Sequence, residues 1–251
     1  MEISFLGRED GLGNRLLEIT FLEYLADKNN IKINYYWNNN PTRPDRNYPI
    51  LINSKNVQII IDPNANSNFE NHFNKKSILS SMNKDDWAKY ASLITPKFAS
   101  PKKDHERVSI HLRGGDRVIK FNREFIKNYK TKEQNDFMYT SLQYKYLQNK
   151  SLKYINSKKP ENIFVCSDSE KEKNNYIKKL NFQHFFNFHN FEEGIPNVYK
   201  DFFNLAYSNE IVMASKFSSF AIMASLVGQT RLMVHKGINI YERYSKYVNY
   251  Y

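Results

Sequence analysis

Apolar and polar residues alternate along several short stretches of the chain, and a period of two is the pattern of a β-strand with one buried face. The clearest stretch is residues 108–112, in which valine, isoleucine and leucine alternate with serine and histidine. Gly114 and Gly115 follow Arg113 and are expected to end the strand, because glycine tolerates the backbone angles of a tight turn. The polar face of this strand therefore carries His111 and Arg113 to its carboxyl end.

Other apolar runs of similar length recur, separated by segments with helical spacing. The expected strands are residues 3–6, 31–37, 57–61, 108–112, 162–166, 182–186, 211–214 and 231–235. The expected helices are residues 16–25, 85–93, a largely helical, polar and exposed region 121–154, residues 171–180, a helix that starts at Asp201, and residues 222–227, which Ser218 or Ser219 caps and Gly228 ends. From residue 108 onward, this alternation predicts a parallel sheet with helices on both faces, which residues 231–235 close.

Two prolines and a run of charges interrupt these patterns near the middle of the chain. Pro96, Pro101 and the charged residues 102–107 are typical of a boundary between domains. The chain of 251 residues is long enough for two small domains that each bury a core. We therefore predict two α/β domains, residues 1–104 and residues 105–251.

The composition is that of a soluble globular protein, with 41% hydrophobic and 25% charged residues. Cys166 is the one cysteine, so an intrachain disulfide is excluded and the fold does not depend on an oxidising compartment. Residues 1–10 lack the apolar core of a signal peptide, and residues 211–227, the most apolar segment, are too short to span a bilayer. We expect a cytoplasmic protein, either free or resting on a membrane surface.

The formal net charge of +11 raises the question of nucleic-acid binding. The lysines are scattered, however, and they increase together with Asn, Ile, Tyr and Phe, as AT-rich coding would produce. A generally basic solvated surface is therefore the favoured explanation of the charge. An anionic ligand, an anionic membrane face and nucleic acid stay open, although no recognisable nucleic-acid-binding motif is visible.

Polar side chains follow three of the expected strands at their carboxyl ends. They are His111 and Arg113, then Ser167 and Asp168, then Ser218 and Ser219. The carboxyl ends of parallel strands meet at one edge of a sheet, so these side chains can converge on one ligand. The set favours a nucleotide diphosphate, with Arg113 and the serines at a helix start on phosphate. Asp168 or Asp201 would accept a hydrogen bond from a ribose hydroxyl or a base amino group.

Each of these residues also has an ordinary structural role. Arg113 could form an ion pair with Asp116, and His111 could be a half-buried core histidine. Ser218 and Asp201 could serve as helix caps without binding any ligand. The functional interpretation therefore depends on the set and not on any single residue.

The segment between the first strand and the first helix, residues 7–15, reads Gly-Arg-Glu-Asp-Gly-Leu-Gly-Asn-Arg. A strand, a glycine loop and a helix in this order turn backbone N–H groups toward an anion. The segment is neither a P-loop, which needs Gly-Lys followed by Ser or Thr, nor a complete dinucleotide fingerprint. On its own, it is also compatible with plain turn chemistry.

Taken together, these motifs resemble those of the GDP-fucose-dependent fucosyltransferases, which include the α-1,2- and α-1,6-fucosyltransferases, the nodulation fucosyltransferase and the protein O-fucosyltransferases. Residues 111–116, His-Leu-Arg-Gly-Gly-Asp, are similar to the first motif of the family, His-x-Arg-Arg-x-Asp. Residues 11–14 are similar to its Gly-x-Gly-Asn loop, and residues 164–168 to its strand that ends in Ser/Thr-Asp. Residues 201–219 resemble the motif that runs from an aspartate to Phe-Ser-Ser.

The resemblance implies a GT-B-like fold, with two Rossmann-like domains that contain parallel sheets and with the donor bound mainly by the carboxyl-terminal domain. The implied donor contacts are Arg113 with the β-phosphate, His111 and Asp201 with guanine, Ser219 and the neighbouring Ser218 with phosphate, and Gly13 and Asn14 in a loop that closes over the donor. Gly114 stands at the position of the family's second arginine, which bears on the linkage formed and on the donor sugar.

The implied reaction is the inverting transfer of fucose from GDP-fucose to a glycan acceptor, in the synthesis of a surface polysaccharide. Arg113 and the serine-capped helix would meet the negative charge that grows on the leaving GDP, which is stabilisation that increases in the transition state. No metal or other cofactor is expected, because the sequence has no Asp-x-Asp triplet and no clustered histidines. The candidate bases for the acceptor hydroxyl are Asp10, Asp116 and Glu124, of which Asp10 is favoured because it borders the donor loop.

Three other functions stay open at this point. One is a glycosyltransferase that uses another nucleotide sugar, and another is an inactive glycan- or nucleotide-binding protein that keeps the fold. The third is a basic nucleic-acid-binding protein. The transferase interpretation predicts a nucleotide sugar and a glycan as partners, and no nucleic acid.

Overall fold

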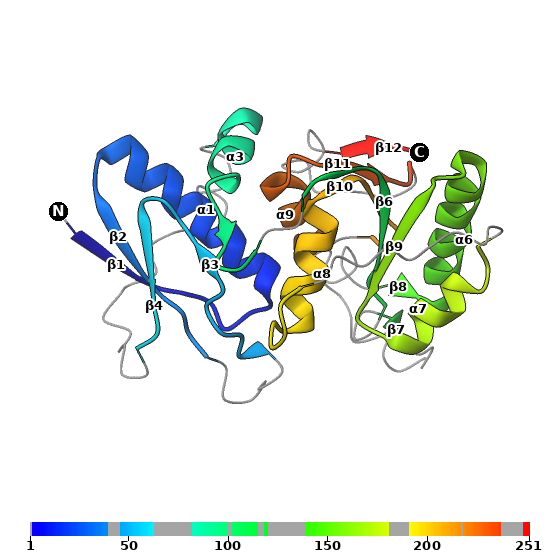
Figure 1. Ribbon diagram of the computed structural model, residues 1–251, viewed down its shortest axis with the longest axis horizontal. Coiled ribbons are helices and arrows are strands. Elements are labelled where there is room, and N and C mark those ends of the chain that lie inside the picture. Colours follow the sequence, from blue (N-terminus) through cyan, green and yellow to red (C-terminus); the bar gives the residue numbers. More distant parts are fainter. Residues whose placement is uncertain are drawn as a thin grey trace, which may run out of the picture.

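The computed structural model describes residues 2–39, 46–62, 82–99, 102–114, 118–119, 139–180, 191–216, 218–236 and 248–251. Figure 1 shows two groups of strands side by side, one from the first part of the chain and one from the part that begins near residue 104. Helices lie between the two groups and on the outer side of the second. The result is a mixed α/β fold built on parallel sheets.

In the part of the chain that the structure describes, the smaller sheet has three parallel strands. In spatial order they are β1 (Glu2–Leu6), β2 (Lys32–Tyr36) and β4 (Val57–Ile60). The predicted alternation holds in β2, where Ile33 and Tyr35 are buried. The helices of this part are α1 (Leu12–Asn29) and α3 (Lys84–Ala91), and β3 (Ile52–Asn53) pairs antiparallel with β5 (Thr95–Pro96). The three strands of this sheet and both helices lie within a few residues of their expected positions, whereas β3 and β5 were not predicted.

Among the described residues, the larger sheet has five parallel strands that alternate with helices. In spatial order they are β12 (Val248–Tyr250), β11 (Arg231–Val234), β10 (Ser208–Met213), β6 (Asp104–Leu112) and β9 (Asn162–Ser167). The helices are α6 (Ser141–Lys158), α7 (Glu170–Ile177), α8 (Asn197–Ala206) and α9 (Ser219–Val227). A short parallel pair joins β7 (Val118–Ile119) to β8 (Tyr139–Thr140).

Alternate residues of the strands in the larger sheet enter two separate cores, as the period of two requires. In β9, Ile163 and Val165 belong to a core that includes residues of α6 and α7. Phe164 and Cys166 belong to the core that includes residues of α1, α8 and α9. Helices therefore cover both faces of the sheet, which confirms the prediction of a parallel sheet with helices on both faces.

The structure corrects the expected start of α8, which is not Asp201. Pro196 is the N-cap of this helix, and its carbonyl accepts the N–H of Tyr199 at 3.0 Å. Proline suits this place because its ring fixes φ near the helical value and because it lacks the N–H that a helix interior needs. Asp201 therefore lies more than a turn inside the helix and is not a helix cap.

Three further boundaries differ from the expectation. Residues 231–235 do not close the sheet, because β12 pairs with the outer side of β11. α1 begins at Leu12, so the first turn of the helix takes in part of the predicted glycine loop. α6 begins only at Ser141. One face of this helix is buried, with Leu152 and Ile155 among its buried residues, so the helix is not exposed on all sides as expected. Residues 121–138 and the expected strand 182–186 lie outside the described residues.

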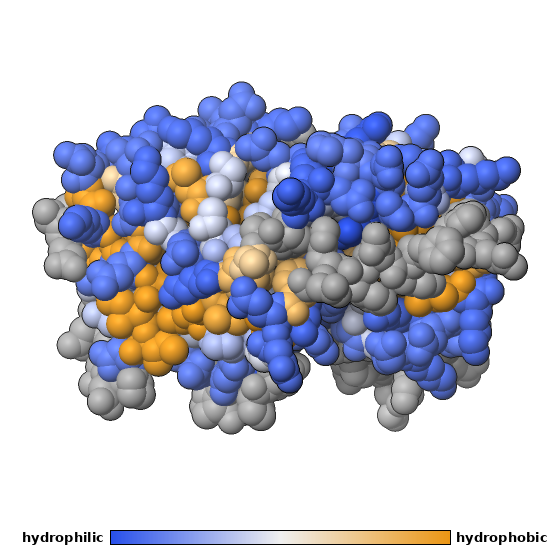
Figure 2. Space-filling view, viewed as in Figure 1, coloured by the Kyte–Doolittle hydropathy of each residue, from blue (hydrophilic) through white to orange (hydrophobic). Residues whose placement is uncertain are grey.

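The apolar segment 211–227 is divided between β10 and α9. Over the residues that the structure describes, no helix combines the length and the apolar character needed to cross a membrane. On the face shown in Figure 2, most of the surface is hydrophilic, and apolar side chains gather where Figure 1 places β4. Ile59 and Ile60 of this strand are half-buried and Ile61 is exposed, so the apolar area includes the edge strand of the small sheet.

The two parts of the chain meet at α9, which packs against α1. A Cβ atom added to Gly13 would lie 2.5 Å from the backbone nitrogen of Phe220, so the start of α1 and the start of α9 are in direct backbone contact. At the other end of α9, Lys103 Nζ donates hydrogen bonds to the carbonyl oxygens of Gly228 (2.9 Å) and Gln229 (3.0 Å). The first part of the chain therefore holds both ends of α9, and a domain boundary at residues 104 and 105 stays a prediction.

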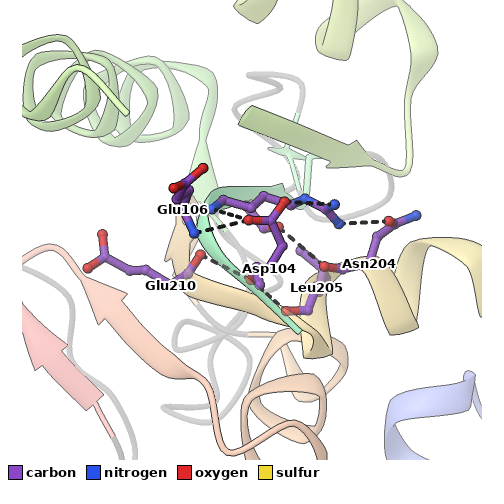
Figure 3. A network of polar contacts seen from close by, with 8 residues as sticks. Asp104, Glu106, Asn204, Leu205 and Glu210 are labelled. Carbon is purple, nitrogen blue, oxygen red and sulfur yellow. Dashed lines mark hydrogen bonds and ion pairs between the residues drawn. The ribbon is translucent and has the colours of Figure 1, made fainter. Parts of the chain in front are cut away.

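A buried polar network ties the amino end of β6 to α8 (Figure 3). The guanidinium of Arg107 is buried, forms an ion pair with Asp104 (3.1 Å) and donates a hydrogen bond to Asn204 Oδ1 (3.2 Å). Asp104 Oδ1 also accepts the backbone N–H of Glu106 at 3.0 Å. The network fixes the amino end of the strand whose carboxyl end carries His111 and Arg113.

Candidate functional site

A cavity of about 520 Å³ lies at the carboxyl edge of the larger sheet, next to the first turn of α1. Its walls come from the loop before α1, from residues 46–48, from the ends of β6 and β9, from α8 and from the start of α9. The amino ends of α1 and α9 both border it, and neither helix has an acidic residue in its first turn. Because free N–H groups and the helix dipole favour negative charge at such ends, the cavity suits an anion.

Most of the residues predicted for the site line this cavity. They are Asp10, Gly13, Asn14, His111, Arg113, Asp168, Asp201 and Ser219. Ser218 is the N-cap of α9 instead: its Oγ accepts the N–H of Ala221 at 3.4 Å, which is the capping role that the sequence left open. Asp116 and Glu124, the two other candidate bases, lie outside the described residues.

Arg113 lies just beyond β6 and faces Asp168, which lies just beyond β9. Arg113 Nη1 is 3.5 Å from Asp168 Oδ2, and Asp168 Oδ1 accepts the backbone N–H of Gly114 at 3.1 Å. Because β6 and β9 are neighbours in the sheet, this contact links their carboxyl ends. The side chains of Arg113 and Asp168 are 29% and 21% exposed, so the guanidinium is oriented by Asp168 and still accessible from the cavity.

His111 lines the cavity with a side chain that is otherwise buried. Burial, together with the charge of Arg113, lowers the pKa of its imidazole to about 3, so the ring is neutral at physiological pH. Its Nδ1 atom is buried and has no hydrogen-bond partner among the described residues, and the ring lies 5.8 Å from that of Phe220. A neutral imidazole offers one donor and one acceptor, so His111 can recognise a polar edge of a ligand.

Asp201 reaches the cavity from α8, beside Cys166 at the end of β9. Burial raises the pKa of the Asp201 carboxyl to about 6, although a hydrogen bond from the Cys166 thiol and the charge of Lys173 oppose this shift. Burial, and after it the charge of Asp201, raises the pKa of the Cys166 thiol well above its usual value. Cys166 is therefore a thiol that donates to Asp201 rather than a reactive thiolate.

Asp10 closes the amino-terminal side of the cavity and is held by several neighbours. Its Oδ2 atom lies 2.5 Å from Arg8 Nη2 and accepts a hydrogen bond from Asn14 Nδ2 at 3.2 Å. Its Oδ1 atom lies 3.7 Å from Arg46 Nη1. Asn14 is in turn fixed by its backbone N–H, which donates to the carbonyl of Gly11 at 3.0 Å. The loop before α1 is thus shaped by a cluster of ionic and amide contacts around one carboxylate.

Arg15 holds the loop before α1 through a hydrogen bond to its backbone, and it was not predicted as part of the site. Its guanidinium is fully buried and lies 4.5 Å from the centre of the Trp37 ring. Nε donates to the carbonyl oxygen of Asp10 (2.8 Å), and Nη2 donates to the carbonyl oxygen of Arg46 (3.2 Å). Arg15 therefore joins the backbones of two segments that line the cavity. Trp37 and Arg46 lie far from position 15 along the chain, so the local sequence pattern gives no signal of this role.

Arg46 and Tyr48 also line the cavity without having been predicted. They lie next to a stretch of asparagines and prolines that has no periodic pattern, so nothing in the sequence points to them. For metals, the structure shows no group of three or more His, Cys, Asp and Glu side chains that could hold an ion, within the ranges that it describes.

Comparison with known proteins gives similarity in structure but not in sequence. No protein-family model matches the chain, and no curated protein matches it. The NodZ α-1,6-fucosyltransferase co-crystallised with GDP is 11% identical, with a TM-score of 0.55 over 94% of this chain and 95% of that one. POFUT1 in complex with GDP-fucose is 12% identical, with a TM-score of 0.51 over 95% and 98% of the two chains.

A third similar structure is the fucosyltransferase NodZ from Bradyrhizobium, which is 10% identical with a TM-score of 0.50 over 90% of this chain and 92% of that one. In each case the likeness runs through nearly the whole length of both chains. This confirms the predicted fold class, and the chain has the GT-B-like α/β fold of the fucosyltransferases POFUT1 and NodZ.

Proposed function

We propose that this protein is a glycosyltransferase that moves fucose from GDP-fucose to a glycan acceptor of a surface polysaccharide. The observation that carries the proposal is the convergence of Arg113, His111, Asp201 and Ser219 on one cavity at the carboxyl edge of a parallel sheet. The fold supports it, since the similar structures are fucosyltransferases that include complexes with GDP and GDP-fucose. Most of the donor would be held by the part of the chain after residue 104, and the acceptor would face the part before it.

The donor would lie with its base and its diphosphate on different walls of the cavity. His111 and the Asp201 carboxylate offer a neutral ring and an acceptor, which suit the N–H groups and ring nitrogens of guanine. Arg113 and the start of α9 at Ser219 offer charge-assisted hydrogen bonds and free backbone N–H groups, which suit phosphate. The two sets are on neighbouring strands and helices, so one nucleotide diphosphate can reach both.

The proposed reaction is an inverting displacement at the anomeric carbon of the sugar. The bond from this carbon to the β-phosphate oxygen breaks, and a bond to the acceptor oxygen forms on the opposite side. Negative charge grows on the departing GDP, and Arg113 stabilises it more strongly in the transition state than in the ground state. The acceptor hydroxyl loses its proton to a base. Among the described residues, the proposed base is Asp10, which lies in the loop before α1 and lines the cavity.

A ligand-binding experiment tests the donor assignment. GDP bound at 100 times its dissociation constant is expected to raise the melting temperature by about 5–10 °C, because a ligand that binds the folded chain stabilises it by mass action. UDP, ADP and CMP should give little shift. The protein should then transfer fucose from GDP-fucose, with full activity in excess EDTA. A shift with UDP alone, or with DNA and no nucleotide, would overturn the proposal, and loss of activity in EDTA would contradict a metal-independent reaction.

The titration of Asp201 gives a second prediction. At pH 5 its carboxyl is largely protonated, because burial raises the pKa to about 6, and it then no longer accepts hydrogen bonds from guanine as a carboxylate. Asp201→Asn is therefore expected to weaken GDP binding about tenfold at pH 8, the loss of a hydrogen bond to a charged group. Titration calorimetry between pH 5 and pH 8 should show a flatter pH dependence for the variant than for the wild type. An unchanged pH profile would contradict the role of Asp201.

The same substitution supplies its own control for folding. Because the pKa is raised in the folded state from about 4, the folded chain keeps a proton between about pH 4 and pH 6 that the unfolded chain releases. Stability therefore falls as the pH rises through this window and stays at the lower level above it. Asparagine removes that loss, so Asp201→Asn should melt at a higher temperature than the wild type at pH 8, and weaker GDP binding could not be ascribed to unfolding.

A further inference from the structure

We propose that Arg46 supplies the second positive charge on the leaving diphosphate, and that it exchanges Asp10 for the diphosphate when the donor binds. The inference rests on the proposed function and assigns to this chain a donor-binding residue outside the four motifs. It starts from Gly114, which follows Arg113 and leaves the strand end with a single arginine.

The space beside Gly114, the residue after Arg113, is occupied by the ends of two side chains. A Cβ atom on Gly114 would lie 2.7 Å from the hydroxyl oxygen of Tyr144 and closer still to Glu172 Oε2. Tyr144 donates a hydrogen bond to that same carboxylate, so the two side chains fill the space together. A longer side chain at position 114 would have to displace both of these side-chain ends, and one of them is an acidic group. A second cation on the diphosphate would therefore come from another part of the cavity.

Arg46 is the side chain that can provide it. Among the described residues that line the cavity, Arg46 and Arg113 are the two that carry a permanent positive charge. They approach from different parts of the chain, Arg46 from the segment after β2 and Arg113 from the end of β6. Two guanidinium groups on one diphosphate suit the several negative charges of that group, and each can bind phosphate oxygens through a planar fork of donors.

The backbone of Arg46 is fixed, whereas its side chain is held loosely. Its carbonyl oxygen accepts the hydrogen bond from the buried guanidinium of Arg15 at 3.2 Å. Its side chain is 21% exposed, and Nη1 lies 3.7 Å from Asp10 Oδ1, a distance that makes an ion pair but is too long for a hydrogen bond. A diphosphate that offers hydrogen-bonded contacts can therefore draw this side chain away from Asp10 without moving the backbone.

The exchange leaves Asp10 in place, because two other contacts hold its second oxygen. Arg8 Nη2 lies 2.5 Å from Asp10 Oδ2, and Asn14 Nδ2 donates to the same oxygen at 3.2 Å. Departure of Arg46 uncovers Oδ1 alone. Donor binding would thus expose one carboxylate oxygen at the cavity, which is the atom that the proposed base needs for the proton of the acceptor.

The test compares the affinities for GDP and GMP, which differ by the phosphate that Arg46 is proposed to hold. In titration calorimetry, Arg46→Gln is expected to weaken GDP binding by about 10–100-fold, the range for a lost charge-assisted hydrogen bond. Its affinity for GMP should stay close to that of the wild type. Arg8→Gln is the matched control, because Arg8 pairs with the same carboxylate but does not line the cavity, and it should keep the wild-type ratio of GDP to GMP affinity.

A second variant separates direct binding from an effect through Asp10. If Arg46 contacts the diphosphate, Asp10→Asn removes its competitor and should bind GDP at least as tightly as the wild type. If Arg46 acts only by holding Asp10, Asp10→Asn and Arg46→Gln should lose GDP affinity together, and the inference would be wrong. An unchanged ratio of GDP to GMP affinity in a folded Arg46→Gln, checked by its melting temperature, would also overturn it. Failure of the wild type to bind either nucleotide would instead refute the proposed function.

Discussion

Arg113→Ala is expected to lower the rate of fucose transfer from GDP-fucose by about 10²–10³-fold, the loss seen when one preorganised donor to a developing anion is removed. Arg113 lies at the carboxyl end of β6, where Asp168 orients its guanidinium toward the cavity. The charge that it meets appears only as the leaving group departs, so the larger effect should be on kcat and the smaller on KM. Arg113→Lys should also be severely impaired, since a single ammonium replaces a planar fork of donors.

The control for this experiment is an arginine of the same sheet that lies away from the cavity. Arg231 is exposed at the amino end of β11, the opposite edge of the sheet, and Arg231→Ala should transfer fucose like the wild type. Arg113→Ala should still fold, because Asp168 keeps its hydrogen bond to the backbone of Gly114. Near-normal transfer by a folded Arg113→Ala would exclude the proposed contact between Arg113 and the leaving diphosphate.

The second large effect is expected from Gly13→Ala, in the first turn of α1. The new Cβ atom would lie 2.5 Å from the nitrogen and 2.6 Å from the Cα atom of Phe220, and both are backbone atoms that cannot turn aside. Overpacking of this kind costs about 1–3 kcal/mol of stability or more. In a chain of this length the melting temperature should therefore fall by about 3–10 °C. GDP binding should weaken as well, since both helix ends that the methyl group pushes apart border the cavity.

Gly11→Ala is the matched control for this prediction. Gly11 is the N-cap of α1, two residues before Gly13, and lines the same cavity. Apart from its chain neighbours, no heavy atom of the described residues lies within 4 Å of the place that its Cβ would take. Its φ of −62° is open to any residue, so Gly11→Ala should keep the wild-type melting temperature. A Gly13→Ala variant that melts like Gly11→Ala would show that the two helix starts can separate at no cost.

The elements that sequence reasoning predicted correctly are those whose pattern is local. The period of two in β6 and the continuous apolar run in β9 reveal strands. The rule that parallel strands share one carboxyl edge then brings Arg113 and Asp168 together before any coordinates are known. Asp201 shows where local reasoning fails. An aspartate resembles a helix cap in sequence, but Pro196 starts the helix earlier, so that Asp201 is free to line the cavity.

The residues that the sequence did not reveal depend on partners far along the chain. Arg15 is buried because Trp37 and the carbonyl oxygen of Arg46 surround its guanidinium, and neither follows from the pattern around position 15. Glu23 is fully buried on α1, where its carboxylate accepts backbone hydrogen bonds from Asn56 (2.7 Å) and Val57 (3.3 Å). Such charges are stable in a core only when their partners arrive with the tertiary fold, so a single sequence gives them no signature.

The attachment of α9 at both ends has a consequence for how a donor enters. Hinge opening between the two sheets would have to separate the start of α1 from Phe220 and pull Lys103 from the carbonyl oxygens of Gly228 and Gln229 at the same time. The helix therefore acts as a strut that resists rotation of one half against the other. We therefore expect a donor to reach the cavity by movement of side chains that line it, such as Arg46, rather than by rotation of one half of the molecule against the other.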